Sequence, residues 1–371
     1  MQIPILDLKA QLAQYRAEAM AAITRVVDSQ SLILGAEVKA FEADLAAYMG
    51  LGHAVGVSSG TDALLVALMA LDIGPGDVVL TTPFSFFATA GVIARLGATP
   101  RFVDIDPVTF NLDEAGVRAG LDDDVRAIIP VHLFGQMADL GELYDDPATP
   151  PIVEDAAQAV GATLRGRMSG HFGVCTCISF YPTKNLGAFG DAGAVVAADE
   201  MFAEKLRMLR VHGSKPKYFH HVVGGNFRLD AIQAAVLAVK LKLLDGWAAG
   251  RADNAARYDA LFAESGLADR GLVTPPKAVV DGRHVFNQYV IRAARRDDLR
   301  AHLARQGIGS MVYYPRPLHL QPCFAELGYG PGDFPVAEKA CEQVLALPIQ
   351  PELGPDALAR VVAEIATFYR L

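Results

Sequence analysis

Short apolar runs alternate with longer helical stretches through the first part of the chain. The clearest runs lie at Val78–Thr81, Thr99–Asp104, Ala127–Val131 and Ile152–Glu154. Turn-forming stretches rich in glycine, proline and aspartate separate them, for example residues 74–77. Because short buried strands that alternate with helices are typical of βαβ units, the pattern predicts an α/β fold with a mostly parallel sheet.

The spacing of apolar residues changes near residue 229. Apolar side chains then recur at steps of three and four, at Leu229, Ile232, Val236, Val239 and Leu243. This spacing predicts one long amphipathic helix, which we expect to join two domains. We place a large domain with an N-terminal arm at residues 1–248 and a smaller C-terminal α+β domain at residues 249–371. The smaller domain is expected to contain a strand at His284–Arg292, a helix from Asp297 to Gly307, a strand at Met311–Tyr314 and a final helix from about Pro355.

Composition narrows the class of protein. The chain has 371 residues, 52% of them hydrophobic, and a mean hydropathy of +0.25, so it can bury a large core and is neither disordered nor fibrous. A formal net charge of −9 argues against a nucleic-acid partner, which would require a basic face. The N-terminus lacks a basic region leading into an apolar segment, and no apolar run reaches the ~18 residues that span a bilayer. We therefore expect a cytoplasmic protein with no membrane partner.

Cysteine and histidine patterns give no sign of a metal. The cysteines lack zinc-ligand spacing, so we expect small core residues in a reducing compartment, at Cys175, Cys177, Cys323 and Cys341. His132 follows an apolar strand and is either a core residue or a neighbour of a bound cofactor. His220 lies in a stretch rich in lysine, histidine and glycine, which is either a lid over a site or a solvated loop.

Lys184 is the first candidate for chemistry. It follows an apolar, β-favouring run at residues 174–180 and lies just after Pro182, at the edge between a strand and a loop. Desolvation there would lower the pKa of the lysine and provide the neutral amine that Schiff-base chemistry needs. The alternative is a surface lysine whose stem lies along apolar residues.

A carboxylate and an amide follow another apolar run upstream. Asp155 and Gln158 come after the strand that ends near Val153, with the spacing that one helical turn would bring to the same face. Open α/β sheets bind ligands at the carboxyl ends of their strands. Asp155 could equally be the N-cap of a helix.

A third element is the turn at Ser58–Thr61. It joins an apolar strand at Ala54–Val57 to an alanine- and leucine-rich helix that runs to about Leu71. The N-terminus of a helix binds anions, and Gly60 would let the backbone approach a phosphate closely. An ordinary capped helix is the alternative, because both nucleotide-binding glycine motifs are absent here.

These elements resemble the DegT/DnrJ/EryC1/StrS family of sugar-nucleotide aminotransferases, which have the aspartate aminotransferase fold (fold type I). The resemblance covers essentially the whole chain. It rests on residues 59–64 (SGTDAL), 130–136 (PVHLFGQ), 154–158 (EDAAQ), 179–185 (SFYPTKN), 224–230 (GGNFRLD) and 314–319 (YPRPLH). Two departures are small: Asp191–Gly193 replaces a commoner glycine-rich pattern, and Phe86 stands where some relatives have tyrosine or tryptophan.

The resemblance implies an α/β protein whose large domain has a mostly parallel seven-stranded sheet, with pyridoxal 5′-phosphate as cofactor. It implies that Lys184 holds the cofactor, that Asp155 pairs with its ring nitrogen, and that an acid there keeps this nitrogen protonated. The other cofactor-binding residues that it implies are Gly60, Thr61, Phe86, Gln158, Ser179 and, from the neighbouring subunit, Asn226. The candidate substrate contacts are Tyr181, His220, Tyr313, Tyr314 and His319.

Transamination is the expected reaction, because family members that act as dehydratases have histidine in place of Lys184. By resemblance, L-glutamate is the amino donor and a keto-sugar nucleotide the acceptor, first a 3-keto hexose on dTDP or UDP and second a 4-keto sugar. The site would be shared between the subunits of a homodimer. A non-enzymatic regulator and a cofactor-free Schiff-base lyase are the alternatives. The first has no need of Lys184 with Asp155, and the second has no use for an anion-binding turn at Ser59–Asp62.

Overall fold

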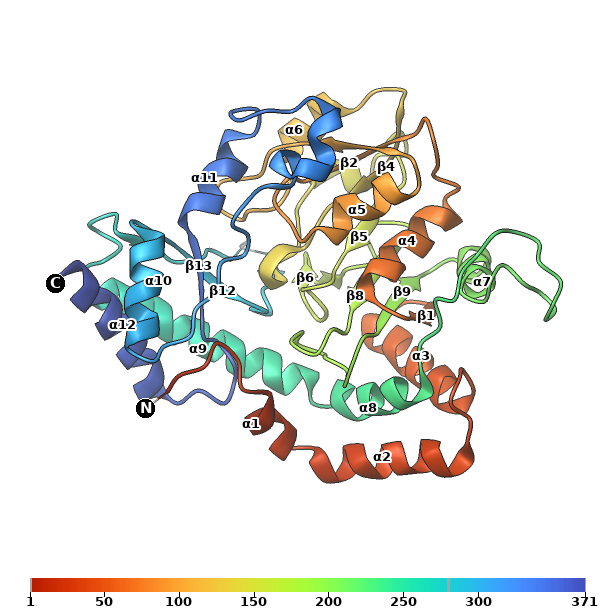
Figure 1. Cartoon of the computed structure of the whole chain (residues 1–371), viewed down its shortest axis with the longest axis horizontal. Coiled ribbons are helices and arrows are strands. Elements are labelled where there is room, and N and C mark those ends of the chain that lie inside the picture. Colours follow the sequence, from red (N-terminus) through yellow and green to blue (C-terminus); the bar gives the residue numbers. More distant parts are fainter. Residues whose placement is uncertain (1, 279–280, 371) are drawn as a thin grey trace.

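One sheet runs through the larger part of the molecule (Figure 1). The structure is a computed structural model that describes residues 2–278 and 281–370. Parallel bridges from Ile128 to Ile152 and from Val131 to Asp155 join a four-stranded and a three-stranded sheet, so the described residues form seven neighbouring strands. Their order is β1 (His53–Val57), β9 (Gly193–Ala197), β8 (Cys175–Ser179), β5 (Val153–Asp155), β4 (Val125–Ile129), β2 (Val78–Thr81) and β3 (Thr99–Phe102). Within this part of the chain that the structure describes, β9 alone runs antiparallel to its neighbours, which confirms a mostly parallel sheet.

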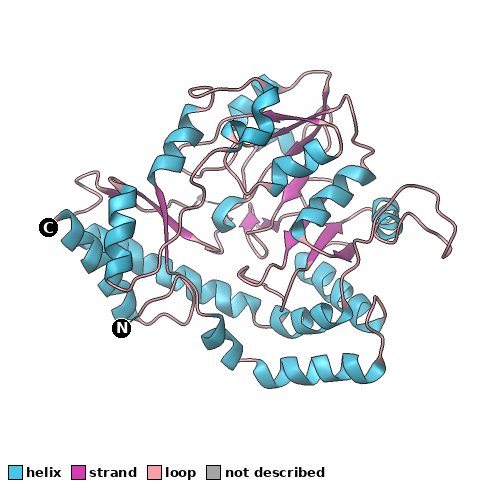
Figure 2. Cartoon of the chain, viewed as in Figure 1, coloured by secondary structure: helices cyan, strands magenta, loops and turns pink. Residues whose placement is uncertain are grey.

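Helices cover both faces of this sheet (Figure 2). Successive strand residues point to opposite faces, so Val55 and Val57 contact one helical layer and Ala54 contacts the other. The first layer contains α4 (Gly60–Ala70), α5 (Ala88–Arg95) and α7 (Glu200–Leu209). The second contains α2 (Arg16–Ser29), α3 (Ala36–Met49) and α8 (Ala231–Leu241). Burial on both faces explains why the strands are apolar runs with little alternation.

A second, antiparallel sheet lies in the C-terminal part. Its strands are β10 (Val273–Thr274), β12 (Tyr289–Ala293) and β13 (Val344–Leu347). One face packs on α9 (Leu244–Glu264), α10 (Arg296–Arg305) and α12 (Pro355–Tyr369), and the other on α11 (Pro335–Gln343). The predicted domain boundary at residue 249 falls inside α9 and stays a prediction.

Short elements complete the chain. They are the helices α1 (Leu8–Ala13) and α6 (Glu114–Gly120), the 3₁₀ turns at Leu133–Gly135, Gly141–Tyr144, Leu318–Leu320 and Pro322–Leu327, and a small sheet of β6 (Thr163–Leu164), β7 (Arg167–Met168) and β11 (Gly282–Arg283). No helix among the described residues is both long and apolar enough to cross a bilayer.

Three predicted elements differ from the structure. The long helix expected from Leu229 ends at Leu241, because the amide of Leu243 bonds to the carbonyl of Lys240 with 3₁₀ spacing, and α9 begins as a separate helix. The strand expected at Met311–Tyr314 is a single bridge from Met311 to Ala346. Prolines at 315 and 317 cannot donate ladder hydrogen bonds, so pairing stops there.

The strand expected at His284–Arg292 begins only at Tyr289. Before it, Phe286 has a positive φ of 42°, and its ring stacks on His284 with centroids 3.9 Å apart. The alternation of polar and apolar residues over His284–Arg292 therefore reflects a turn followed by a strand, and not one continuous strand.

A buried ion pair links α3 to the end of α7. The Glu42 carboxylate accepts hydrogen bonds from the Gly56 amide, at 2.7 Å, and from the Arg210 guanidinium. Arg210 also donates to the Gly56 carbonyl at 2.9 Å. The side chains of Arg210 and Glu42 are only 8% and 12% exposed, so each charge depends on the other for solvation.

Loss of one partner should leave the other charge buried and unpaired. We expect Arg210→Met to lower the free energy of unfolding by about 3–5 kcal/mol. Lys205→Met is the matched control, because Lys205 pairs with Asp72, which is 81% exposed, and should cost less than about 1 kcal/mol. Urea denaturation of both variants measures the difference. Equal losses of unfolding free energy in the two variants would contradict the claim that burial makes the Arg210–Glu42 pair important for stability.

Candidate active site

A pocket of about 610 Å³ opens where β5 and β8 end beside the N-terminus of α4. It is deep enough for a cofactor together with part of a substrate. The described residues that line it are Ser59, Gly60, Thr61, Leu64, Ser85, Phe86, Ala88, Val131, Asp155, Ala157, Gln158, Ser179, Tyr181, Thr183, Lys184, Asp191, Ala192, Gln288, Tyr313 and Tyr314.

The first turn of α4 forms one end of the pocket. Ser59 is the N-cap, and its hydroxyl accepts a hydrogen bond from the Asp62 amide at 3.0 Å. The amides of Gly60 and Thr61 lie in this first turn, where helical N–H groups lack helical partners. A Cβ on Gly60 would lie 2.5 Å from the Cβ of Ser179, so only glycine allows the helix to meet β8 this closely. The turn is therefore suited to bind an anion.

Lys184 lies in a tight loop after β8. Its amide donates to the Tyr181 carbonyl at 2.8 Å, and the amide of Ala188 returns to the Phe180 carbonyl at 2.8 Å. Burial lowers the pKa of Lys184 to about 8, and the charge of Asp155 acts in the opposite direction. The side chain lines the pocket instead of following the outer surface, which argues against a solvated lysine. A substantial fraction of this amine is neutral near pH 8.

Asp155 ends β5 and is 4% exposed. Its carboxylate accepts hydrogen bonds from the Thr89 hydroxyl at 2.9 Å and the Ala157 amide at 3.2 Å. Burial raises the pKa of Asp155, while these hydrogen bonds and the Lys184 ammonium oppose that shift. The expected helical turn does not form after it. Instead, the Ala159 amide bonds to the Ala156 carbonyl and the Ala162 amide to the Ala159 carbonyl, so two β-turns follow one another. Asp155 is therefore no helix N-cap.

Gln158 nevertheless reaches the same pocket. Its Oε1 accepts from the Phe134 amide at 2.7 Å, and its Nε2 donates to the Tyr314 hydroxyl at 3.2 Å. These two contacts fix the orientation of the amide. Burial raises the pKa of Tyr314, so its hydroxyl keeps its proton.

Most of the other sequence-predicted residues also lie at the pocket. Ser179 stands against α4, and Tyr313 precedes Tyr314 in the wall. Phe86 and Tyr181 are 59% and 53% exposed although both line the pocket, so their rings can contact a ligand.

Asn226 lies outside this pocket. It lines a different cavity of about 320 Å³, together with Ile33, Ser58, Asp191, Arg228, Asp230 and Gln233. His220 is exposed in the loop between α7 and α8, where its Nδ1 contacts the His212 carbonyl at 2.8 Å. Neither residue meets Lys184 within one chain.

Two other histidines are buried. His132 bonds to the Glu154 carboxylate at 2.9 Å and accepts from the Ala138 amide at 3.0 Å, so it is a satisfied core residue. His319 is 1% exposed and packs against Phe334 with centroids 4.7 Å apart, outside the residues that line the pocket. Among the described residues, no group of three or more His, Cys, Asp or Glu side chains could hold a metal ion.

Sequence reasoning missed the residues that come from other parts of the chain. Thr89 on α5 bonds to Asp155 from 66 positions away, and it contacts Ser85 at 3.0 Å. The available signal in the sequence was a pair of hydroxyl side chains, Ser85 and Thr89, four residues apart at the start of an apolar helix. Gln288 reaches the wall from the segment before β12, and the sequence gives no signal for it.

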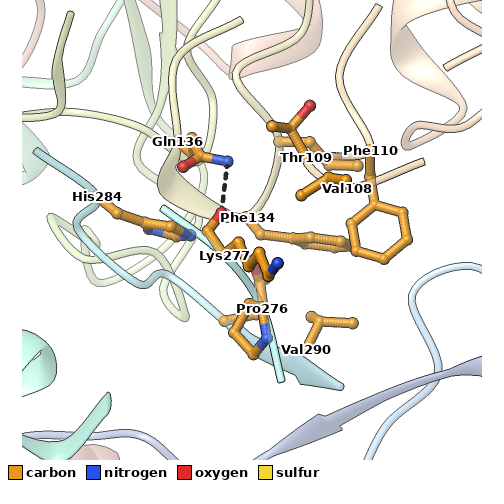
Figure 3. Close-up of a pocket in the computed structure, with 11 residues that line it drawn as sticks. Val108, Thr109, Phe110, Phe134, Gln136, Pro276, Lys277, His284 and Val290 are labelled. Atoms are coloured by element: carbon orange, nitrogen blue, oxygen red, sulfur yellow. Dashed lines mark hydrogen bonds between the residues drawn. The ribbon is translucent and has the colours of Figure 1, made fainter. Parts of the chain in front are cut away.

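Gln288 also borders a much smaller cavity of about 10 Å³ (Figure 3). There Gln136 donates to the Lys277 carbonyl at 3.3 Å, and the rings of Phe110 and Phe134 close the space. This volume holds no more than a water molecule. The larger pocket is therefore the candidate active site.

Comparisons with known proteins agree with the geometry. The model of the DegT/DnrJ/EryC1/StrS aminotransferase family matches residues 13–366. A "pleiotropic regulatory protein" of Geobacillus stearothermophilus is 53% identical over all of this chain and 99% of that protein. The dTDP-3-amino-3,4,6-trideoxy-alpha-D-glucose transaminase of Streptomyces venezuelae is 45% identical, covering 97% of this chain and 94% of that enzyme.

The fold also closely matches that of a solved structure. The crystal structure of S. venezuelae DesV in complex with a ketimine intermediate superposes with a TM-score of 0.95 at 43% identity, covering 100% of this chain and 99% of that one. A family match over nearly the whole length, together with Lys184, Asp155 and the start of α4 in one pocket, leads to one conclusion: the chain belongs to the DegT/DnrJ/EryC1/StrS aminotransferase family.

Proposed function

We propose that the chain is a pyridoxal phosphate-dependent aminotransferase that moves an amino group from L-glutamate to a keto-sugar nucleotide. The observation that carries the proposal is the meeting of an amine, a buried carboxylate and an anion-binding helix start in one pocket. The product would be an amino sugar for a surface polysaccharide or a secondary metabolite.

The residues of the pocket fit this cofactor. The amides of Gly60 and Thr61, with the Ser179 hydroxyl, would hold its phosphate at the positive end of α4. Asp155 would hold the ring nitrogen, and Lys184 would bind covalently. When bound, the cofactor supplies an electron sink for the negative charge that develops at the α-carbon of the donor.

The chain's own groups then perform three tasks. Lys184, with its lowered pKa, takes a proton as the neutral amine and returns it as the ammonium. Asp155 stays charged against a cation because Thr89 and the Ala157 amide already stabilise its carboxylate. Gln158 is held in one orientation by its hydrogen bonds to Phe134 and Tyr314, so it presents a fixed polar group to a ligand. The exposed ring of Phe86 provides a face on which the cofactor ring could stack.

A 3-keto hexose on dTDP or UDP is our first choice of acceptor. The 45% identity to a relative named for a dTDP-3-amino sugar supports this choice. Tyr181, Tyr313 and Tyr314 line the pocket and would contact the sugar, whereas His319 is buried and does not line the pocket. A 4-keto sugar nucleotide is the second candidate within the same reaction class.

A regulatory role is the alternative from another class, and one relative carries that name. A binding module would need neither an amine with a lowered pKa nor a buried carboxylate opposite it. These two groups therefore favour catalysis.

We propose further that two chains share each site in a homodimer. Asn226 lines a second cavity, which shares Asp191 with the pocket but does not include Lys184. The loop between α7 and α8 projects from the body of the molecule (Figure 1) and exposes Tyr218, Phe219 and Val223 by 77%, 66% and 90%. Such apolar exposure is expected of a segment that packs against a partner. Asn226, at the end of this loop, would then bind the phosphate of the partner's cofactor.

Asp155→Asn should lower kcat by orders of magnitude and change donor binding far less, because the amide cannot keep the ring nitrogen protonated. Steady-state kinetics with L-glutamate measure this. Asp139→Asn is the control, since Asp139 is a surface carboxylate paired with Arg165. A kcat for Asp155→Asn close to that of the control would remove Asp155 from the mechanism.

Mixing two inactive variants should restore activity if the sites are shared. In a heterodimer of Lys184→Ala and Asn226→Ala chains, one site carries both lesions and the other carries neither. We expect Asn226→Ala alone to weaken cofactor retention, and the co-refolded mixture to exceed the summed activity of the parents. Size-exclusion chromatography identifies the active species. Heterodimers without added activity would show that Asn226 does not act in trans, and an active monomer would contradict the shared site.

A further inference from the structure

Two side chains of α8 hold the loop that follows Lys184. Gln233 and Lys240 are seven residues apart, which is two helical turns, so they lie on the same face of the helix. The Gln233 Oε1 accepts a hydrogen bond from the Phe189 amide at 2.8 Å. The Lys240 ammonium donates to the Gly187 carbonyl. The helix thus binds one N–H and one C=O of the same short loop.

Lys240 is an unusual residue for this task. It is 2% exposed, and within the described residues no carboxylate lies at ion-pair distance from it. Its ammonium lies 5.3 Å from the ring centre of Tyr15 and 5.7 Å from that of Trp247. Burial lowers its pKa to about 8. A buried amine without a counter-ion is costly unless it is hydrogen-bonded, so the Gly187 carbonyl and the two rings are what stabilise it.

The neighbours of Lys240 make further close contacts on each side. Trp247 donates from its ring nitrogen to Gln14 at 2.9 Å, which ties α9 to the N-terminal helices. On the loop side, a Cβ on Gly187 would lie 2.3 Å from the Pro182 carbonyl, so the loop backbone is folded tightly upon itself. A displacement at Gly187 therefore passes to Lys184 through only two intervening residues of backbone.

We infer that Lys240, together with Gln233, is a positioning residue that clamps the loop at residues 187–189 and thereby aims the Lys184 amine into the pocket. The pocket residues do not include Lys240, so it acts through the loop and touches no ligand. The catalytic consequence rests on the proposed function, whereas the clamp itself is a property of the chain without cofactor.

Hydrogen exchange of the cofactor-free protein tests the clamp. The amides of Lys184 and Ala188 bond to backbone carbonyls and to neither clamp residue, so their exchange reports the loop itself. Lys240→Met keeps the apolar stem and removes the donor. We expect exchange at these amides to rise about tenfold, in line with the loss of a hydrogen bond to a charged group, while the amides of β8 stay unchanged. Lys242→Met is the control, because Lys242 is exposed at the end of the same helix.

Kinetics of the cofactor-loaded enzyme give an independent readout. If the loop aims Lys184, Lys240→Met should lower kcat about tenfold and leave KM for glutamate within about twofold. Hydrogen exchange in Lys240→Met that is unchanged in the loop, or that rises equally in the loop and in β8, would overturn the clamp. A fall in kcat that Lys242→Met reproduces would overturn it as well.

A second variant covers the case in which Lys240→Met does not fold. Gln233→Leu removes the other contact and should also raise exchange at Ala188, and unchanged exchange there would overturn the clamp. A wild-type chain that shows the protected loop but transaminates no substrate would contradict the proposed function and leave the clamp in place.

Discussion

The close approach of α4 to the end of β8 is the constraint on which the pocket depends. Two glycines make this approach possible. A Cβ on Gly60 would lie 2.5 Å from the Ser179 Cβ, and one on Gly193, which pairs with Ser179 from the neighbouring strand β9, would lie 2.4 Å from the carbonyl carbon of Ser59. Because only the small Ser179 side chain lies between the two elements, the positive end of α4 is close to the end of β8, where the loop with Lys184 begins. The anion-binding turn at the start of α4 and the Lys184 amine therefore line the same pocket.

Electrostatics gives two buried groups, Lys184 and Asp155, different chemical roles. Burial lowers the pKa of Lys184 and raises that of Asp155, and each group counteracts the shift of the other. Thr89 and the Ala157 amide further stabilise the charged carboxylate. The result is a pocket with a reactive amine and a carboxylate prepared for a cationic partner, which is the combination that an electron-sink cofactor requires. Lys240 is a second buried amine. It has no carboxylate at ion-pair distance among the described residues, and it donates a hydrogen bond to the backbone of the loop.

Sequence patterns predicted the parts of the site that depend on strand ends. Lys184 and Asp155 follow neighbouring parallel strands, whose carboxyl ends meet at one edge, so their convergence followed from the βαβ pattern. Local spacing could not place Thr89 or Gln288, because their contacts depend on how distant elements pack. The same limit explains His319, which a family motif assigned to the sugar site but whose ring packs against Phe334. The break between α8 and α9 was missed because the apolar spacing of three and four continues across it.

Transfer of labelled nitrogen is the sharpest test of the proposed reaction. Purified protein loaded with pyridoxal phosphate would be incubated with ¹⁵N-glutamate and a panel of 3-keto and 4-keto sugar nucleotides on dTDP and UDP. Mass spectrometry should find ¹⁵N in the sugar product, first with a 3-keto acceptor, and none with Lys184→Ala. A chain that binds the cofactor but transfers no label to any acceptor, or a Lys184→Ala variant that still transfers it, would contradict the assignment of this pocket as an aminotransferase site.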